Sequence, residues 1–327
     1  MSKIQIFVTL GTSSINPNFL KFINKKVSLV RLNMSHINLS ELRQKILFIK
    51  KYCKVPICID TEGAQIRTKL KKLKRIRYKK GKILSINKKK GKFTFYPNDI
   101  LDKLKVNDRL DIGFEGLKIK LIKKTQNKIS FKCLTGGLLE NNKGVHLLNR
   151  KVKLNYLTSK DFEAIKIAKE LNIKNFALSF TNTRSDIINF KKILPNQEKY
   201  FKIETKNAIK NLDFFFKNAR NFLIDRGDLS KDIGITNIPI SQRKIFKKSK
   251  KIKNIKPKIA VATNFLESMI DKPFPTRAEV NDIFNALEMG ANGLVLAAET
   301  AIGKYPKECV KLLIDIIKVF KKNKKNL

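Results

Sequence analysis

The sequence predicts an α/β protein, a (β/α)8 TIM barrel with a small all-β lid domain inserted after strand 3. Three observations support this fold class. Eight short apolar runs of strand type are spread over 327 residues, and amphipathic stretches of helical period separate most of them. Repeated strand and helix units form parallel sheets, and eight of them close a barrel. The alternation breaks only once, between about Thr68 and Leu157.

The predicted strands are short, and most are rich in β-branched or aromatic residues. They are Ile4 to Thr9, Val27 to Leu32, Val55 to Asp60, Asn175 to Phe180, Tyr200 to Glu204, Asn221 to Asp225, Pro257 to Thr263 and Gly293 to Leu296. The predicted helices between them show apolar residues at helical spacing. They are Leu39 to Lys51, Lys160 to Leu171, Asp186 to Leu194, Ala278 to Glu288 and Lys307 to Phe320.

The interrupting segment differs in composition from the rest of the chain. It is punctuated by glycine and contains β-rich runs such as Lys92 to Tyr96 and Lys128 to Cys133. We therefore predict a barrel formed by residues 1–68 and 157–327, with an inserted β-barrel-like domain over 69–156 that acts as a lid. Two tandem domains are the alternative, but only three strands precede the insertion, too few to close a core.

Polar residues follow the predicted strands at their carboxyl ends, where barrel enzymes carry their active sites. They are Thr9, Arg31, Asn33, Ser35, Asp60, Thr61, Ser179, Lys202, Glu204, Arg226, Asp228, Thr263 and Glu299. Polar residues placed by chance would be divided between both ends of the strands. This bias predicts an active site at the carboxyl end of the barrel.

Lys202, Glu204 and Asp228 form the most informative group among these residues. Residues two apart on a strand face the same side, so Lys202 and Glu204 are expected in one cavity, with Asp228 arriving from the next strand. Two carboxylates suit Mg²⁺, and a nearby lysine neutralises a phosphoryl group during transfer. From these three residues alone, an ordinary ion-pair cluster is an equal alternative.

The formal net charge of +44 normally points to nucleic acid or an anionic surface. Here the excess is lysine spread along the whole chain, and the densest runs lack aromatic interleaving. Those runs are Lys69 to Lys80, Lys88 to Lys92 and Lys247 to Lys258. We expect no dedicated nucleic-acid partner, although the positive field would attract anionic substrates.

Several other function classes are disfavoured by missing patterns. The four cysteines show neither zinc spacing nor a disulfide framework. No apolar run approaches the length of a membrane span, which predicts a cytoplasmic protein without a membrane partner. Neither G-x-x-x-x-G-K-[ST] nor G-x-G-x-x-G occurs, so any nucleotide is held by side chains and a lid.

Longer motifs along the whole chain resemble those of the pyruvate kinases. They are Lys3 to Ser14 (KIQIFVTLGTSS), Val30 to His36 (VRLNMSH), Ile59 to Thr68 (IDTEGAQIRT), Lys143 to Val145 (KGV), Leu157 to Asp161 (LTSKD), Lys202 to Glu204 (KIE), Arg226 to Leu229 (RGDL), Ala262 to Met269 (ATNFLESM), Pro275 to Val280 (PTRAEV) and Glu299 to Pro306 (ETAIGKYP).

The resemblance implies phosphoryl transfer from phosphoenolpyruvate to ADP, giving pyruvate and ATP, the last step of glycolysis. It implies that Glu204 and Asp228 hold Mg²⁺ or Mn²⁺ and that Lys202, Arg31 and Thr263 are catalytic. Arg31, Lys202 and Thr263 would also bind the substrate. Its carboxylate would be received by Thr263 and by the backbone around Gly227 and Asp228, where a helix is expected to begin.

The resemblance also implies a monovalent-cation site and a nucleotide site. The K⁺ site would be formed by Asn33, Ser35, Asp60 and the carbonyl of Thr61. The nucleotide would be bound by residues from the barrel and from the lid. These are Asn33, His36, Arg67 and Lys143. Gln65 replaces a residue that accompanies K⁺ dependence or independence in the family, so the need for K⁺ stays open.

The sequence also departs from the family pattern. It ends shortly after the predicted helix Lys307 to Phe320, which follows the eighth strand, so the C-terminal regulatory domain is expected to be absent, leaving a monomer or a barrel-mediated homo-oligomer. Asp225 adds a carboxylate beside Arg226, and the segment from Glu62 to Gln65 has drifted. Alternative hypotheses are a catalytically impaired relative that binds or regulates, a polyanion-binding protein, and another barrel enzyme acting on enolates.

Overall fold

The computed structural model describes residues 4–71, 75–87, 91–113 and 116–323. It divides the chain into two compact units, one formed by Met1–Gly63 with Ser159–Leu327 and the other by Ala64–Thr158. The first boundary lies a few residues earlier than expected, because the strand Ile66–Leu70 pairs with strands of the inserted unit. Parts of two lysine runs, at 72–74 and 88–90, lie outside the described residues.

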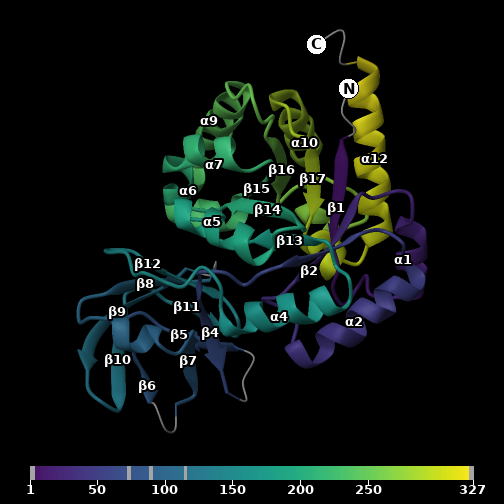
Figure 1. Ribbon diagram of the computed structural model, residues 1–327. Coiled ribbons are helices and arrows are strands. Elements are labelled where there is room, and N and C mark those ends of the chain that lie inside the picture. The colour runs from purple at the N-terminus through teal and green to yellow at the C-terminus, as the bar shows by residue number, and fades with distance from the viewer. Residues whose placement is uncertain (1–3, 72–74, 88–90, 114–115, 324–327) are drawn as a thin grey trace. The chain divides into compact units, whose positions relative to one another are not determined.

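The first unit is a closed barrel of eight parallel strands, as predicted (Figure 1). Around the barrel the strands follow the order β1, β17, β16, β15, β14, β13, β3 and β2. Their bounds are β1 Gln5–Thr9, β2 Leu29–Asn33, β3 Ile57–Asp60, β13 Asn175–Leu178, β14 Glu198–Ile203, β15 Asn221–Asp225, β16 Lys258–Ala262 and β17 Gly293–Leu296. Each of the eight predicted strands is confirmed.

Helices connect consecutive barrel strands, with the inserted unit between β3 and α4. Their bounds are α1 Pro17–Ile23, α2 Leu39–Tyr52, α4 Ser159–Glu170, α5 Arg184–Ile193, α6 Lys206–Lys210, α7 Leu212–Asn218, α8 Arg226–Ile233, η1 Ile235–Asn237, α9 Ile238–Lys250, η2 Glu267–Ile270, α10 Arg277–Met289, α11 Ala298–Ala301 and α12 Pro306–Asn323. The five predicted helices are confirmed, and α8 begins beside Gly227 as expected. The sequence did not predict α1, α6, α7 or α9 because the first three are short and α9 is rich in lysine.

An apolar layer fills the inside of the barrel. Every strand contributes at least one side chain to it: Phe7, Leu29, Cys58, Ala177, Tyr200, Leu223, Ala260, Ala262 and Val295. Layers of this kind make the interior of such barrels a packed core rather than a pore. The layer therefore forms a closed floor beneath the residues at the carboxyl ends of the strands.

The inserted unit is antiparallel, as its glycine-rich turns suggested. A seven-stranded sheet runs in the order β6, β10, β9, β8, β12, β4, β7, and a two-stranded sheet pairs β11 with β5. The strands are β4 Ile66–Leu70, β5 Arg75–Tyr78, β6 Ile83–Asn87, β7 Phe93–Tyr96, β8 Arg109–Ile112, β9 Leu117–Lys124, β10 Lys128–Cys133, β11 Gly137–Glu140 and β12 Gly144–Leu147. The unit has its own core around Phe95 and Phe131, and it includes one helical turn, α3 Ile100–Lys103, which an all-β prediction omits.

The long final helix, α12, is amphipathic and not apolar all round. It buries one face, which includes Leu313, Ile317 and Phe320, while Lys318 and Lys321 on the other side are exposed. Across the described residues, no helix combines the length and the apolar character needed to cross a bilayer.

Candidate active site

Four strands place a charged residue directly above the apolar floor. In each strand a floor residue is followed two positions later by a charged one, and side chains two apart face the same side of a sheet. The pairs are Leu29 with Arg31, Cys58 with Asp60, Tyr200 with Lys202, and Leu223 with Asp225. All four charged residues are buried, with at most 7% of their surface exposed. Together they form a charged layer at the carboxyl end of the barrel.

Lys202 contacts more charged groups than any other side chain of this layer. Its Nζ atom lies 2.8 Å from Oε1 of Glu204, 3.2 Å from Oδ2 of Asp225 and 3.6 Å from Oδ2 of Asp60. It also donates to Oγ of Ser179 at 3.3 Å. Burial by itself lowers the pKa of Lys202, but the carboxylates outweigh burial and raise the pKa above its ordinary value. Lys202 is therefore a fixed positive charge at neutral pH.

Arg31 and Asp60 form a second buried ion pair on the neighbouring strands β2 and β3. Arg31 also donates from Nη1 to Oγ1 of Thr9 at 3.2 Å, and Oγ of Ser179 donates to Oδ1 of Asp60 at 3.2 Å. Burial raises the pKa of Asp60, but Lys202 and Arg31 outweigh it, so that the net pKa is lowered. Both oxygens of Asp60 are thus engaged by groups that keep it ionised.

Three carboxylates, from Glu204, Asp225 and Asp228, lie together beside Lys202. One oxygen from each is within 4.8 Å of the others. Asp228 belongs to the first turn of α8, directly after β15 ends at Asp225, which agrees with the predicted end of the strand and start of a helix. Burial, followed by the charges of Asp225 and Asp228, raises the pKa of Glu204 to about 8, although Lys202 opposes the shift. A set of hard oxygen donors with excess negative charge fits a divalent cation such as Mg²⁺.

Thr263 follows β16 with a backbone conformation that is rare for a β-branched residue, at φ 74°. Its hydroxyl donates to the carbonyl of Ala262 at 2.5 Å and accepts from the amide of Gly227 at 2.9 Å. The guanidinium of Arg226 holds the Thr263 carbonyl and pairs with Asp282 at 2.6 Å. Strained residues held in this way cluster at functional sites. The structure thus brings Thr263 and Gly227 together, as the sequence suggested.

The residues assigned to the monovalent cation lie on and after the neighbouring strands β2 and β3. Asn33 and Asp60 are paired in register, and the amide of Ser35 donates to Oδ1 of Asn33 at 3.0 Å. Thr61 accepts from the amide of Ser179 through its hydroxyl at 3.0 Å. The side chains of Asn33, Asp60 and Thr61 thus all accept hydrogen bonds within the protein, while the carbonyl of Thr61 is the group assigned to K⁺.

The residues assigned to the nucleotide are divided between the two units. Asn33 and His36 belong to the barrel, where the amide of His36 donates to the carbonyl of Asn33 at 3.0 Å. Arg67 and Lys143 belong to the inserted unit. There Arg67 pairs in register with Gly144 and donates to the carbonyl of Asn142 at 3.2 Å, and Lys143 pairs with Glu140 at 3.3 Å. Arg67 and Lys143 are thus near neighbours within that unit.

Asp161, which was not predicted as a site residue, holds the loop after β3. Its carboxylate accepts from the amides of Glu62 at 2.7 Å and Gly63 at 3.1 Å. Gly63 has φ 67°, and a Cβ atom there would lie 2.5 Å from the carbonyl oxygen of Ser179. Asp161 is the last residue of the motif LTSKD, and this motif is the feature of the sequence that points to it. Asp225 was noted only as an added carboxylate, although its spacing from Leu223 already predicts that it faces inward.

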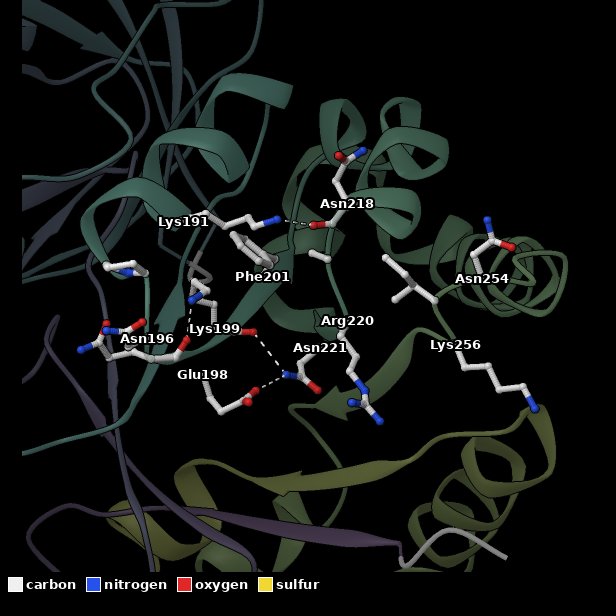
Figure 2. Close-up of a pocket in the computed structure, with 14 residues that line it drawn as sticks. Lys191, Asn196, Glu198, Lys199, Phe201, Asn218, Arg220, Asn221, Asn254 and Lys256 are labelled. Carbon is white, nitrogen blue, oxygen red and sulfur yellow. Dashed lines mark hydrogen bonds between the residues drawn. The ribbon is translucent and has the colours of Figure 1, made fainter.

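A pocket of about 730 Å³ lies at the opposite end of the barrel, around the amino ends of β14 and β15 (Figure 2). It is lined by cations, chiefly Lys191, Lys199, Arg220 and Lys256, and by one acid, Glu198. Lys191 donates to a backbone carbonyl at 3.1 Å, and Glu198 accepts from an asparagine amide at 3.0 Å. This pocket has no cluster of carboxylates, and it contains none of the residues predicted for the active site.

Comparison with known proteins agrees with the geometry at the carboxyl end. The family model described as pyruvate kinase, barrel domain, matches residues 1–310. A pyruvate kinase of Thermotoga maritima is 33% identical over 97% of this chain and 71% of its own length. That of Methanocaldococcus jannaschii is 34% identical over 98% of this chain and 70% of its own length.

A pyruvate kinase of Staphylococcus epidermidis is 32% identical over 97% of this chain but only 56% of its own length. The chain thus spans about 70% of some curated relatives and little more than half of others. The family model covers nearly the whole chain, including both ends of the barrel and the inserted unit. The chain therefore belongs to the pyruvate kinase family.

Proposed function

We propose that this protein transfers the phosphoryl group of phosphoenolpyruvate to ADP, with a divalent cation, to give pyruvate and ATP. The observation that carries the proposal is the buried ammonium of Lys202, which lies between Glu204 and Asp225 above the barrel floor. A buried cation beside a cluster of carboxylates matches what phosphoryl transfer requires, namely one fixed positive charge and one cation site.

In this proposal the divalent ion is Mg²⁺ or Mn²⁺, and Glu204 and Asp228 would hold it. When bound, such an ion polarises substrate oxygens and neutralises charge that develops on them. Asp225 lies close enough to these carboxylates to affect the same centre. The K⁺ site is proposed at Asn33, Ser35, Asp60 and the carbonyl of Thr61. The side chains of Asn33, Asp60 and Thr61 already accept hydrogen bonds, so the carbonyl of Thr61 is the main group offered to K⁺.

The substrate would bind between the two buried cations and the start of α8. Lys202 would compensate charge on the phosphoryl group, with Arg31 assisting from β2. The substrate carboxylate would meet the amides at Gly227 and Asp228, because the first amides of a helix lack partners within it, and the Gly227 amide would exchange its bond to the Thr263 hydroxyl for one to the substrate. Thr263 would orient this end of the substrate and lie near the route by which the enolate is protonated. Its contact with the Gly227 amide supports that role.

The nucleotide would be held without a glycine-rich phosphate loop. Asn33 and His36 would contact it from the barrel, and Arg67 and Lys143 from the inserted unit, which would act as a lid. The neighbouring positions of Arg67 and Lys143 on β4 and just before β12 support a shared role for these two side chains. Cytoplasmic location and a monomer or barrel-mediated homo-oligomer remain predictions.

The direct test is to measure pyruvate formed from phosphoenolpyruvate and ADP by the purified protein. We expect turnover with Mg²⁺, no turnover after chelation with EDTA, and none above background for Lys202→Ala. Running the assay with and without K⁺ would decide the monovalent-cation requirement. A folded wild-type preparation that turns over no faster than Lys202→Ala would refute the proposal.

A catalytically impaired relative is the second candidate function. It is favoured by Glu62, which is almost fully buried and paired with Lys160 at 2.9 Å in the segment that departs most from the family pattern. This candidate predicts that phosphoenolpyruvate with Mg²⁺ raises the melting temperature although no pyruvate forms. The two measurements on one preparation therefore separate the candidates.

A further inference from the structure

We propose that Asp225 is a third carboxylate ligand of the divalent-cation centre and gives the centre its affinity for the cation before substrate arrives. This inference rests on the proposed function, because it extends the centre at Glu204 and Asp228. It assigns to Asp225 a direct role in cation binding that is separate from its ion pair with Lys202.

The position of Asp225 allows it to share one ion with the other two carboxylates. It is the last residue of β15, faces the barrel interior two positions after Leu223, and is 93% buried. Its nearest oxygen is within 4.8 Å of oxygens of Glu204 and Asp228. Oxygens bind divalent ions at about 2.0–2.6 Å, so two ligands of one ion lie at most about 4–5 Å apart. The three carboxylates are thus already close to the spacing of one coordination shell.

The two oxygens of Asp225 face different neighbours. Oδ2 lies 3.2 Å from the ammonium of Lys202. Oδ1 is on the side of Gly227, where a Cβ atom added to the glycine would lie 3.6 Å from it. Gly227 directly precedes Asp228, so this oxygen points toward the start of α8, which carries another ligand. Asp225 can therefore keep its ion pair with Lys202 and still offer an oxygen to a cation.

The charge balance of the five buried charged residues and the half-buried Asp228 at this end of the barrel depends on Asp225. Four carboxylates, from Asp60, Glu204, Asp225 and Asp228, face two cations, from Arg31 and Lys202. With all six groups ionised, four negative and two positive charges leave a net charge of −2, which one divalent cation neutralises. Without Asp225 the net charge would be −1. Unbalanced charge is costly at buried sites, and the affinity of oxygen-ligand sites rises with the number of charged ligands.

The test is a Mn²⁺ titration of the substrate-free protein, followed by the electron paramagnetic resonance signal of the free ion. We expect one Mn²⁺ per wild-type chain and an affinity about tenfold or more weaker for Asp225→Asn, because the affinity of such sites depends on the number of charged oxygen ligands. Asp271→Asn is the matched control, because Asp271 is exposed and pairs with the exposed Lys304 at 3.0 Å. It should bind Mn²⁺ like the wild type.

A second pair of variants separates direct ligation from an effect through Lys202. Lys202→Met removes the ammonium, and the double variant Lys202→Met with Asp225→Asn also removes the carboxylate without leaving Lys202 unpaired. A direct ligand predicts that the double variant binds Mn²⁺ more weakly than Lys202→Met alone. Equal affinities for these two variants, or an unchanged affinity for Asp225→Asn, would overturn the inference.

Glu204→Gln distinguishes failure of this inference from failure of the proposed function. If Glu204→Gln loses Mn²⁺ binding but Asp225→Asn does not, the proposed centre stands and only the role of Asp225 is wrong. If Glu204→Gln binds Mn²⁺ as tightly as the wild type, the centre itself is misplaced, and the role of Asp225 falls with it. Circular dichroism and thermal melting of each variant show that it is folded before it is titrated.

Discussion

The two ends of the barrel contain lysines of the same strand in opposite environments. Lys202 lies at the carboxyl end of β14, is 96% buried and contacts carboxylates of Glu204 and Asp225. Lys199, labelled in Figure 2, lies three residues earlier at the amino end. Its ammonium contacts the backbone carbonyls of Leu194 and Gln197. The carboxylates raise the pKa of Lys202, whereas desolvation lowers that of Lys199 despite the nearby Glu198.

The different environments of Lys202 and Lys199 distinguish a lysine of the candidate active site from the other positive charges of a chain with net charge +44. Neutral carbonyls satisfy the hydrogen bonds of Lys199 but supply no compensating charge. At the carboxyl end, buried charges of both signs are linked through short contacts, and such perturbed groups mark functional sites. The net charge of the chain therefore says little about its function, whereas the burial and pairing of individual lysines say much more.

The largest expected effect is the loss of kcat in Lys202→Met, and Lys199→Met is its comparison. Loss of Lys202 removes the charge proposed to face the phosphoryl group, and removing one such electrostatic group typically costs about 10²- to 10³-fold in kcat. Lys199→Met should stay within about twofold of wild type, because it leaves the charged layer intact. Steady-state kinetics of pyruvate formation measure both. Equal losses for the two variants would contradict the division of the barrel into a reactive and an unreactive end.

Thr263→Ala is expected to have the next largest effect. It removes the hydroxyl that accepts from the Gly227 amide, while the strained backbone remains. We expect kcat to fall about 10- to 100-fold, below the range of a full loss of general acid catalysis. Thr263→Ser keeps the hydroxyl and should recover most of the activity. If the serine variant were as slow as the alanine variant, the methyl group rather than the hydroxyl would be the important part.

The third prediction concerns how the stability of the carboxyl end depends on pH. Glu204 has a pKa of about 8 in the folded protein and an ordinary value of 4.5, so its contribution is fully present below 4.5 and is lost as the pH rises through 8. A divalent cation offsets this loss. Mg²⁺ should therefore raise the melting temperature more at pH 8.5 than at pH 6, by a few degrees, since about 1 kcal/mol corresponds to 2–4 °C.

Glu204→Gln is the control for this pH effect, because glutamine does not titrate. The variant should show the same small response to Mg²⁺ at both pH values in thermal melting followed by circular dichroism. A wild-type response to Mg²⁺ that does not change between pH 6 and pH 8.5 would show that Glu204 does not exchange a proton for the cation in this pH range.

The smallest expected effect is at the amino-end pocket. Arg220 and Lys256 are exposed there, so Arg220→Gln with Lys256→Gln should leave kcat and KM within about twofold of wild type. The same variant should elute slightly earlier from a heparin column, because each phosphate or sulfate contact adds about 0.7–0.9 to the salt dependence of polyanion binding. A large loss of turnover in this variant would mean that the pocket takes part in the reaction.

The barrel strands could be predicted from the sequence, and so could the side chains that face the barrel interior. Both follow from local rules, because a run of β-branched residues forms a strand and residues two apart share a face. The adjacent positions of Lys202 and Glu204, 2.8 Å apart, followed in this way, and the helix that begins beside Gly227 was also expected. The inserted unit was predicted because glycine-rich β segments interrupt the alternation of strands and helices. The predicted boundary assigned residues up to Thr68 to the barrel, although β4, Ile66–Leu70, belongs to the inserted unit.

Which charged groups meet depends on how the barrel closes. Asp60 and Lys202 are 142 positions apart in sequence, yet their side chains lie 3.6 Å from one another because the closed barrel brings both strands to one centre. Asp228 comes from the first turn of α8, and Asp225 joins it because β15 ends at that residue. Such contacts depend on closure of the whole ring, which is not encoded within a single local segment, even though the end of β15 at Asp225 was predicted.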